Sequence, residues 1–284
     1  GMIDETADEI ADMQTHSSSV VAVKAARALQ ELADREFPAV EEYLRALERN
    51  SNALRRANPS HASLHNTQSQ VVKRVTDGNP DSVAEAQHLT EEAVAEVIEA
   101  VEAGKRRAAE HGAELLADDD ILLVHDYSTT VLSAVTRAVE EGASFTVYVT
   151  EARPRYLGRK MARRLADLEA VDTRLLVDSA SGHYLPDCDR VVVGMDCIVD
   201  GTLYNRVGTY PLAATAADAG VPVAVIGSAA KLVDEGFAFQ NEFRAASEVM
   251  REPADGFTIE NPAYDATPTR LVDTVVTDEG RVDP

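Results

Sequence analysis

The fold is decided by residues 190–231, which read RVVVGMDCIVDGTLYNRVGTYPLAATAADAGVPVAVIGSAAK. The β-branched run Val191–Val193 predicts a strand that is buried on both faces and that ends just before Asp196. Alanine-rich residues 212–219 predict a helix, and the apolar run Val221–Ile226 predicts the next strand. A strand, a turn, a helix and a second strand form the repeating unit of an open parallel sheet. In such sheets ligands bind where the carboxyl ends of the strands meet the helix N-termini.

The same alternation of strands and helices extends over residues 113–284. The predicted strands are residues 121–125, 145–150, 173–177, 190–194, 221–226 and 272–277, with helices at 129–141 and 158–168. Right-handed crossovers then give an α/β domain with a doubly wound, mostly parallel, Rossmann-like sheet. In the common strand order of such sheets, the first and fourth strands are neighbours.

Residues 1–112 have a different pattern, with amphipathic helical segments punctuated by proline and glycine. A chain of 284 residues is long enough for two ordinary cores. We therefore predict a helical N-terminal domain over residues 1–112 and a Rossmann-like domain with the ligand pocket and a dimer interface over residues 113–284.

The charge is strongly negative and is spread along the chain. There are 49 acidic against 27 basic residues, which gives a formal net charge of −22, and only five of the basic residues are lysines. Such a field repels phosphate backbones, so we expect no direct nucleic-acid binding. We interpret the imbalance as adaptation to a salt-rich, halophilic cytoplasm, with an ordinary acidic protein as the alternative.

Several classes of site and location are disfavoured by missing motifs. Neither G-x-G-x-x-G after the first strand nor G-x-x-x-x-G-K-[ST] occurs, which argues against nicotinamide and Walker-type nucleotide sites, and we predict no cofactor. The two cysteines, Cys188 and Cys197, lack metal-type spacing, so we predict no metal and assign both to packing. No leader and no apolar run of about 18 residues is found, so a soluble, cytoplasmic protein is expected.

Polar residues gather at the predicted carboxyl ends of the strands. Asp126 and Asp196 follow neighbouring strands and should face one crevice, with Arg153 and Lys231 near its rim. Two carboxylates and two cations suit a small phosphorylated sugar, because cations bind the phosphate and carboxylates take hydroxyls or a proton. The alternatives are structural: an aspartate can cap the following helix, and Arg153 can be a solvated residue. We expect one of two neighbouring carboxylates to keep its proton to higher pH.

Four stretches resemble a known family. They are ILLVHDYSTTVL (121–132), FTVYVTEARPRYLGRKMARRL (145–165), VVGMDCIVDGTLYNRVGTY (192–210) and NPAYDATPTRLVDTVVTDEG (261–280). The family contains the alpha, beta and delta regulatory subunits of translation initiation factor 2B, the ribose-1,5-bisphosphate isomerases and the methylthioribose-1-phosphate isomerases. The resemblance implies a homo-oligomer, a dimer or a trimer of dimers.

The resemblance also implies site residues. The isomerases convert an aldose phosphate into a ketose phosphate with a cysteine after the first strand and an aspartate after the fourth, and these positions are Asp126 and Asp196 here. The N-K-I-G-T motif appears with Arg206 in place of lysine. The substrate-binding residues implied or predicted are Ser128, Arg153, Asn205, Arg206, Gly208, Thr209 and Lys231.

Because the thiol is absent, three functions remain open. The first is a factor-2B-like regulatory protein that binds a sugar phosphate or nucleotide without turnover, with initiation factor 2 subunits as further candidate partners. The second is a ribose-1,5-bisphosphate isomerase type of enzyme, an intramolecular oxidoreductase, in which Asp126 replaces the cysteine and pairs with Asp196. The third is an assembly module whose pocket has no function.

Overall fold

The computed structural model describes residues 2–12, 18–233 and 237–284. The chain forms two compact units, Gly1–Gly104 and Lys105–Pro284. The sequence pattern placed the boundary after residue 112, in a helix that continues through it. The difference has a packing reason, because Ala108 and Ala113 in the last turns of that helix already belong to the core of the second unit.

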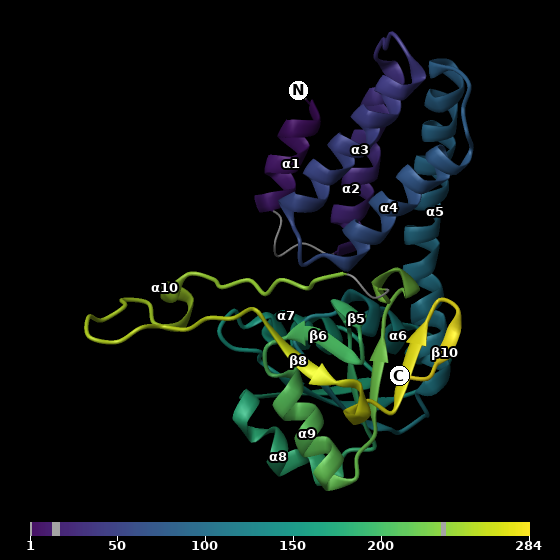
Figure 1. Cartoon of the computed structure of the whole chain (residues 1–284). Helices are drawn as coiled ribbons and strands as arrows, with labels where there is room; N and C mark the ends of the chain where they lie inside the picture. The colour runs from purple at the N-terminus through teal and green to yellow at the C-terminus, as the bar shows by residue number, and fades with distance from the viewer. Residues whose placement is uncertain (1, 13–17, 234–236) are drawn as a thin grey trace. The chain divides into compact units, whose positions relative to one another are not determined.

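The first unit is helical (Figure 1). Its elements are α1 (Met2–Asp12), α2 (Ser18–Leu29), the 3-10 turn η1 (Gln30–Asp34), α3 (Val40–Ala57), α4 (Ala62–Asp77) and the long α5 (Val83–Leu115), which continues into the second unit. Fully buried leucines and valines from these helices form one core, together with Tyr43. The Tyr43 hydroxyl lies 2.6 Å from the Thr90 hydroxyl, so this buried phenol has a hydrogen-bond partner.

Within the described residues of the second unit, seven strands form one sheet in the order β10-β9-β7-β4-β1-β2-β3. The strands are β1 (Ile121–His125), β2 (Phe145–Thr150), β3 (Val171–Leu176), β4 (Arg190–Val193), β7 (Val223–Ile226), β9 (Thr274–Thr277) and β10 (Gly280–Val282). All neighbours pair in parallel except β9 and β10. The predicted fold class is therefore confirmed, and β1 and β4 are neighbours as expected.

Helices cover both faces of this sheet. The covering helices are α6 (Thr129–Glu140), α7 (Leu157–Ala166), the short α8 (Ser181–Tyr184) and α9 (Thr209–Ala219), whereas the short α10 (Ala246–Val249) lies away from the sheet (Figure 1). The 3-10 turns of this unit are η2 (Asp178–Ala180), η3 (Leu185–Asp187), η4 (Ala229–Lys231) and η5 (Thr269–Leu271). Leu122 and Val124 of β1 pack in the core with α6 and α7, whereas Leu123 packs in the core with α9. Successive side chains thus enter opposite cores, which explains the continuous apolar runs in the sequence.

A second, antiparallel sheet was not predicted. It has the order β5-β6-β8, with β5 (Cys197–Val199), β6 (Thr202–Arg206) and β8 (Tyr264–Pro268). The turn from β5 to β6 is made by Asp200 and Gly201, both with positive φ, which is the usual requirement of a two-residue hairpin turn. Residues 199–202, whose sequence indicates a turn, therefore lie at the tip of a hairpin that spans residues 197–206 and carries Arg206 to its end.

No helix in the described part of the chain is both long enough and apolar enough to cross a membrane.

Candidate functional site

Asp126 lies directly after β1, at the carboxyl edge of the main sheet. It has a φ of 69°, in the left-handed region that aspartate tolerates better than most residues. Its side chain is buried, and its Oδ2 lies 3.4 Å from Nε of Arg206. The strand end thus turns a carboxylate inward, where it meets a cation from the second sheet.

The charge state of Asp126 is set mainly by burial. Burial raises the pKa of the Asp126 carboxyl above its ordinary value, and the negative charge of Asp196 raises it further. The charges of Arg206 and His125 act in the opposite direction but do not overcome burial. Asp126 therefore keeps its proton to higher pH than an exposed aspartate does, which is the behaviour predicted for one member of a neighbouring pair.

Arg206 is held between several acidic groups. Burial by itself would lower its pKa, but Asp196, Tyr264 and Asp126 together raise the pKa of the guanidinium, so it stays charged. The guanidinium also lies 5.1 Å from the centre of the Tyr264 ring, a cation–π contact. Lysine at this position would supply a point charge, whereas arginine presents a planar set of donors.

Asp196 lies between β4 and β5, and its charge acts on both Asp126 and Arg206. Within residues 2–12, 18–233 and 237–284, its carboxylate makes no hydrogen bond or ion pair in the structure. Burial lowers the pKa of Lys231, and the charge of Asp196 raises it in part. This electrostatic effect indicates that the two side chains lie near each other. Lys231 Nζ donates to the Met195 carbonyl at 3.0 Å.

The turn before α9, here residues 205–210, carries Asn205, Gly208 and Thr209 as well as Arg206, and its polar groups bond to one another. The backbone N–H groups of Gly208 and Tyr210 donate to Oδ2 of Asp265 at 2.8 and 3.1 Å. Asn205 Nδ2 donates to the Thr209 hydroxyl at 3.1 Å, and that hydroxyl donates to the Arg206 carbonyl at 2.7 Å. The first amides of α9 thus already have an acceptor in the chain. A role for Asn205, Gly208 and Thr209 in binding ligand stays a prediction.

His125, the last residue of β1, packs under this turn. Its Nδ1 lies 2.6 Å from the Thr150 hydroxyl and its Nε2 lies 2.9 Å from the Val207 carbonyl. Gly208 has a φ of 105°, and a Cβ on it would lie 2.8 Å from the His125 ring. Only glycine fits there.

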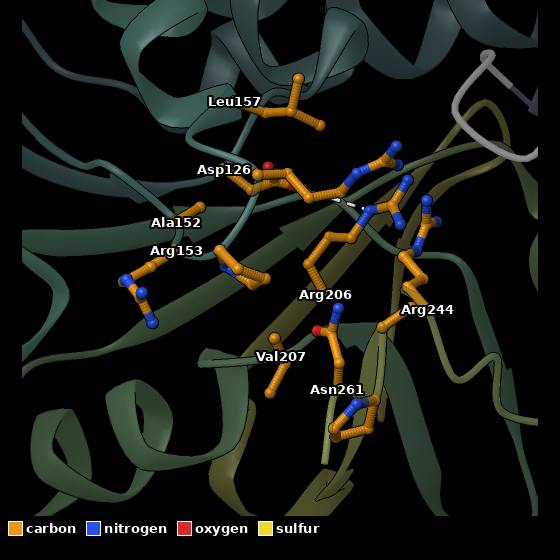
Figure 2. A pocket seen from close by; sticks show the side chains of 12 residues that line it. Asp126, Ala152, Arg153, Leu157, Arg206, Val207, Arg244 and Asn261 are labelled. Carbon is orange, nitrogen blue, oxygen red and sulfur yellow. Dashed lines mark ion pairs between the residues drawn. The ribbon is translucent and has the colours of Figure 1, made fainter. Parts of the chain in front are cut away.

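Ser128 and Arg153 have structural contacts. The Ser128 hydroxyl accepts from the Val131 amide at 3.2 Å and caps α6, the alternative considered for strand-end polar residues. Arg153, which precedes a cis proline, is exposed and donates to the Val249 carbonyl at 2.6 Å and to the Tyr156 hydroxyl at 3.2 Å. In Figure 2 its guanidinium extends away from Asp126. Binding roles for both stay predictions.

A pocket opens beside Asp126 and Arg206. It encloses about 320 Å³, its open mouth included, and two of its lining residues are arginines that the sequence patterns did not single out, Arg155 and Arg244. Figure 2 shows Arg206 and Arg244 side by side at the end of the pocket near Asp126. Arg155 stands two residues after Arg153. It differs from Arg153 in being partly buried, which the structure shows but the sequence does not. Arg244 stands in a segment without periodicity, where no sequence signal marks it.

Neither cysteine offers a replacement for the thiol. Burial raises the pKa of Cys188 to about 11 and the pKa of Cys197 to about 12, and neither residue lines the pocket. In the described part of the chain, no group of three or more His, Cys, Asp and Glu side chains is arranged to hold a metal ion. The arrangement that remains is two carboxylates beside a cluster of arginines.

Comparison with known proteins places these residues in context. Residues 14–284 match the initiation factor 2 subunit family. A ribose 1,5-bisphosphate isomerase of Haloterrigena turkmenica is 35% identical over 299 residues, covering 98% of this chain and 89% of that protein. A ribose 1,5-bisphosphate isomerase of Haloferax volcanii is 34% identical and covers 98% of this chain and 88% of that protein. The crystal structure of the translation initiation factor eIF-2B of Pyrococcus horikoshii OT3 aligns with a TM-score of 0.82 at 27% identity, over 100% of this chain and 97% of that chain.

Proposed function

The chain belongs to the initiation factor 2 subunit family, and we propose from this premise that it is an aldose–ketose isomerase acting on a phosphorylated ribose. The proposal reverses the order of the first two functions considered from the sequence. Two relatives named ribose 1,5-bisphosphate isomerase support it, each more than 30% identical over 98% of the chain. The observation that carries it is the buried carboxyl of Asp126, with its raised pKa, within electrostatic reach of the unpaired carboxylate of Asp196.

In ribose 1,5-bisphosphate the bond between C1 and the ring oxygen breaks and one hydrogen moves from C2 to C1. The C2 hydroxyl loses its proton as it becomes a carbonyl, and the former ring oxygen gains a proton as the C4 hydroxyl. Protons and electrons balance within the substrate, so the protein needs one group that takes up a proton and one that returns a proton. Asp196 suits the first role because no group in the described chain occupies its carboxylate. Asp126 suits the second role because burial favours its protonated form.

Binding without turnover is the second candidate function. Asp126 itself favours it, because the family resemblance implies a cysteine at this position in the isomerases and the two cysteines of this chain are buried with raised pKa values. In that case Asp126 and Arg206 line the pocket, and a partner protein recognises the ligand-bound form. Initiation factor 2 subunits are the candidate partners of such a regulatory protein.

One experiment separates the two functions. The protein is incubated at high salt with ribose 1,5-bisphosphate, and ketose formation is followed by NMR. We expect turnover by the native protein and a loss of at least about 100-fold in Asp196→Asn, because removing a proton-transfer group typically costs that much. Asp200→Asn is the matched control, since Asp200 is an exposed carboxylate in the neighbouring hairpin turn.

Absence of ketose with the native protein, together with a rise in melting temperature on adding the sugar phosphate, would establish binding without turnover. Absence of both effects would favour the assembly module. An Asp126→Cys variant tests the role of residue 126 separately, because turnover gained only by that variant would show that the native carboxyl does not replace the thiol.

A further inference from the structure

Four arginines line the same pocket, and three of them, Arg155, Arg206 and Arg244, have side chains that are at least partly buried. Arg155 comes from the loop before α7, Arg206 from the end of β6, and Arg244 from the segment that precedes α10. Their charges interact, because the positive charges of Arg244 and Arg206 lower the pKa of Arg155 in addition to the larger effect of burial. Gathering three guanidinium groups in one pocket costs free energy unless negative charge lies beside them, and carboxylates of the chain supply part of that charge.

Several nitrogen atoms of these side chains have no acceptor. Nη1 of Arg155, Nη1 of Arg206 and Nε of Arg244 are buried without a hydrogen-bond partner, and Nη2 of Arg244 has an ion pair with Glu242 but no hydrogen bond. The side chain of Arg244 is only 7% exposed, so solvent does not supply the missing acceptors. A buried donor that is left without an acceptor destabilises the folded protein. Such a group of donors is typical of a binding site for an anion.

Each arginine is oriented by one carboxylate. Glu248 lies 3.1 Å from Nε of Arg155, Asp126 lies 3.4 Å from Nε of Arg206, and Glu242 lies 3.3 Å from Nη2 of Arg244. Asn261 donates to Glu248 at 3.0 Å and so fixes the first of these pairs. In the first two pairs the carboxylate contacts Nε, the nitrogen nearest the side-chain stem. The outer Nη1 atoms stay available.

We propose that Arg155, Arg206 and Arg244 together hold the phosphate dianion of the substrate, with Arg155 and Arg244 as the residues that select a phosphorylated over an unphosphorylated sugar. This inference rests on the proposed function, because it assigns one end of the same pocket. A phosphate presents three acceptor oxygens and two negative charges, which match three guanidinium groups with unused donors. Arg153 also lines this pocket, but we do not assign it to the phosphate because its exposed guanidinium is bonded to Val249 and Tyr156.

Binding is tested by titration calorimetry at constant ionic strength with ribose 5-phosphate, inorganic phosphate and ribose. The native protein should bind ribose 5-phosphate, bind inorganic phosphate more weakly and show no heat with ribose. Arg155→Met and Arg244→Met should each lower the affinity for ribose 5-phosphate by about 10- to 100-fold, the usual effect of losing a charge-assisted hydrogen bond. Arg163→Met, which removes an exposed charge from α7, is the matched control and should bind like the native protein.

Affinities of Arg155→Met and Arg244→Met within twofold of native would overturn the proposal, and so would equal binding of ribose and ribose 5-phosphate. Where a methionine variant fails to fold, Arg155→Lys and Arg244→Lys keep the charge but lose the planar donors, and unchanged affinity in both would equally overturn it. The two proposals fail separately. Phosphate-dependent binding without ketose formation would contradict the isomerase proposal but support the arginine site. Turnover with an unchanged KM in both arginine variants would support the isomerase proposal but contradict the arginine site.

Discussion

The turn before α9 and the arginine-lined pocket lie close together but differ in how their polar groups are satisfied. In the turn, the amides of Gly208 and Tyr210 and the side chains of Asn205 and Thr209 all find partners within the chain. In the pocket, buried guanidinium nitrogens have none. A helix N-terminus is a ready anion site only while its amides are free. Here the Asp265 carboxylate already accepts hydrogen bonds from these amides, so the arginines are the groups that can bind an external anion.

The turn should therefore respond to substitution with a loss of stability, and the largest effect is expected at Gly208. Gly208→Ala should lower the free energy of unfolding by about 2–4 kcal/mol, because a Cβ at φ of 105° is strained and would meet the His125 ring. Urea unfolding measures the change. The matched control is Gly220→Ala, where φ is 74° but nothing lies within 4 Å, so a loss of only about 1 kcal/mol is expected. Equal losses in the two variants would show that the His125 contact is unimportant.

An intermediate effect is expected at Asp265, the acceptor of the turn. Asp265→Ala should cost about 1–2 kcal/mol of unfolding free energy, because two amides at the start of α9 lose their acceptor. Asp265→Asn keeps an acceptor oxygen and should lose less. An alanine variant that gains affinity for inorganic phosphate would show that the uncapped amides can bind an anion. An alanine variant as stable as the native protein would remove the structural role given to this carboxylate.

The smallest effect on stability is expected for Asp126→Asn in the pocket. Unlike the substitutions in the turn, it should make the protein more stable at the upper end of the pH range. The folded-state pKa of Asp126 is raised by burial, so its contribution to stability is fully present below about pH 4, the ordinary pKa of aspartate, and is lost as pH rises through the folded-state pKa. Asp126→Asn has no charge to bury and should lack this decline. Melting temperatures followed from about pH 4 to about pH 8 should thus fall less in the variant than in the native protein. Parallel profiles would show that Asp126 does not titrate in this range.

The main sheet and the pairing of Asp126 with Asp196 could be predicted because they follow from local pattern and topology. Buried β-branched runs marked the strands, and the neighbouring positions of β1 and β4 brought the two carboxylates to one edge. The hairpin of β5 and β6 was missed because its strands are short and only partly buried, although Asp200-Gly201 is a strong turn signal.

The arginine cluster could not be predicted, because it depends on contacts between distant segments. Arg244 reaches the pocket because residues 242–244 pair with residues 261–263, through hydrogen bonds from Arg244 N to Asn261 O at 2.9 Å and from Ala263 N to Glu242 O at 2.8 Å. No periodicity marks this pairing. Arg153 and Arg155 differ only in burial, which the sequence around Pro154 does not reveal.

The arm between these paired segments is exposed over most of residues 245–260 and carries α10 (Figure 1). Its base supplies Arg244 and Asn261 to the pocket, while Asp126 belongs to the sheet. An anion that binds Arg244 and Arg206 together would restrict the motion of the base of the arm relative to the sheet. Binding could then be detected in the arm, away from the bound molecule. Amide hydrogen exchange along residues 242–263 would slow on binding, and a protease would cut the arm less readily. Binding in this pocket would thus alter a surface segment of the chain, whether or not the bound molecule is transformed.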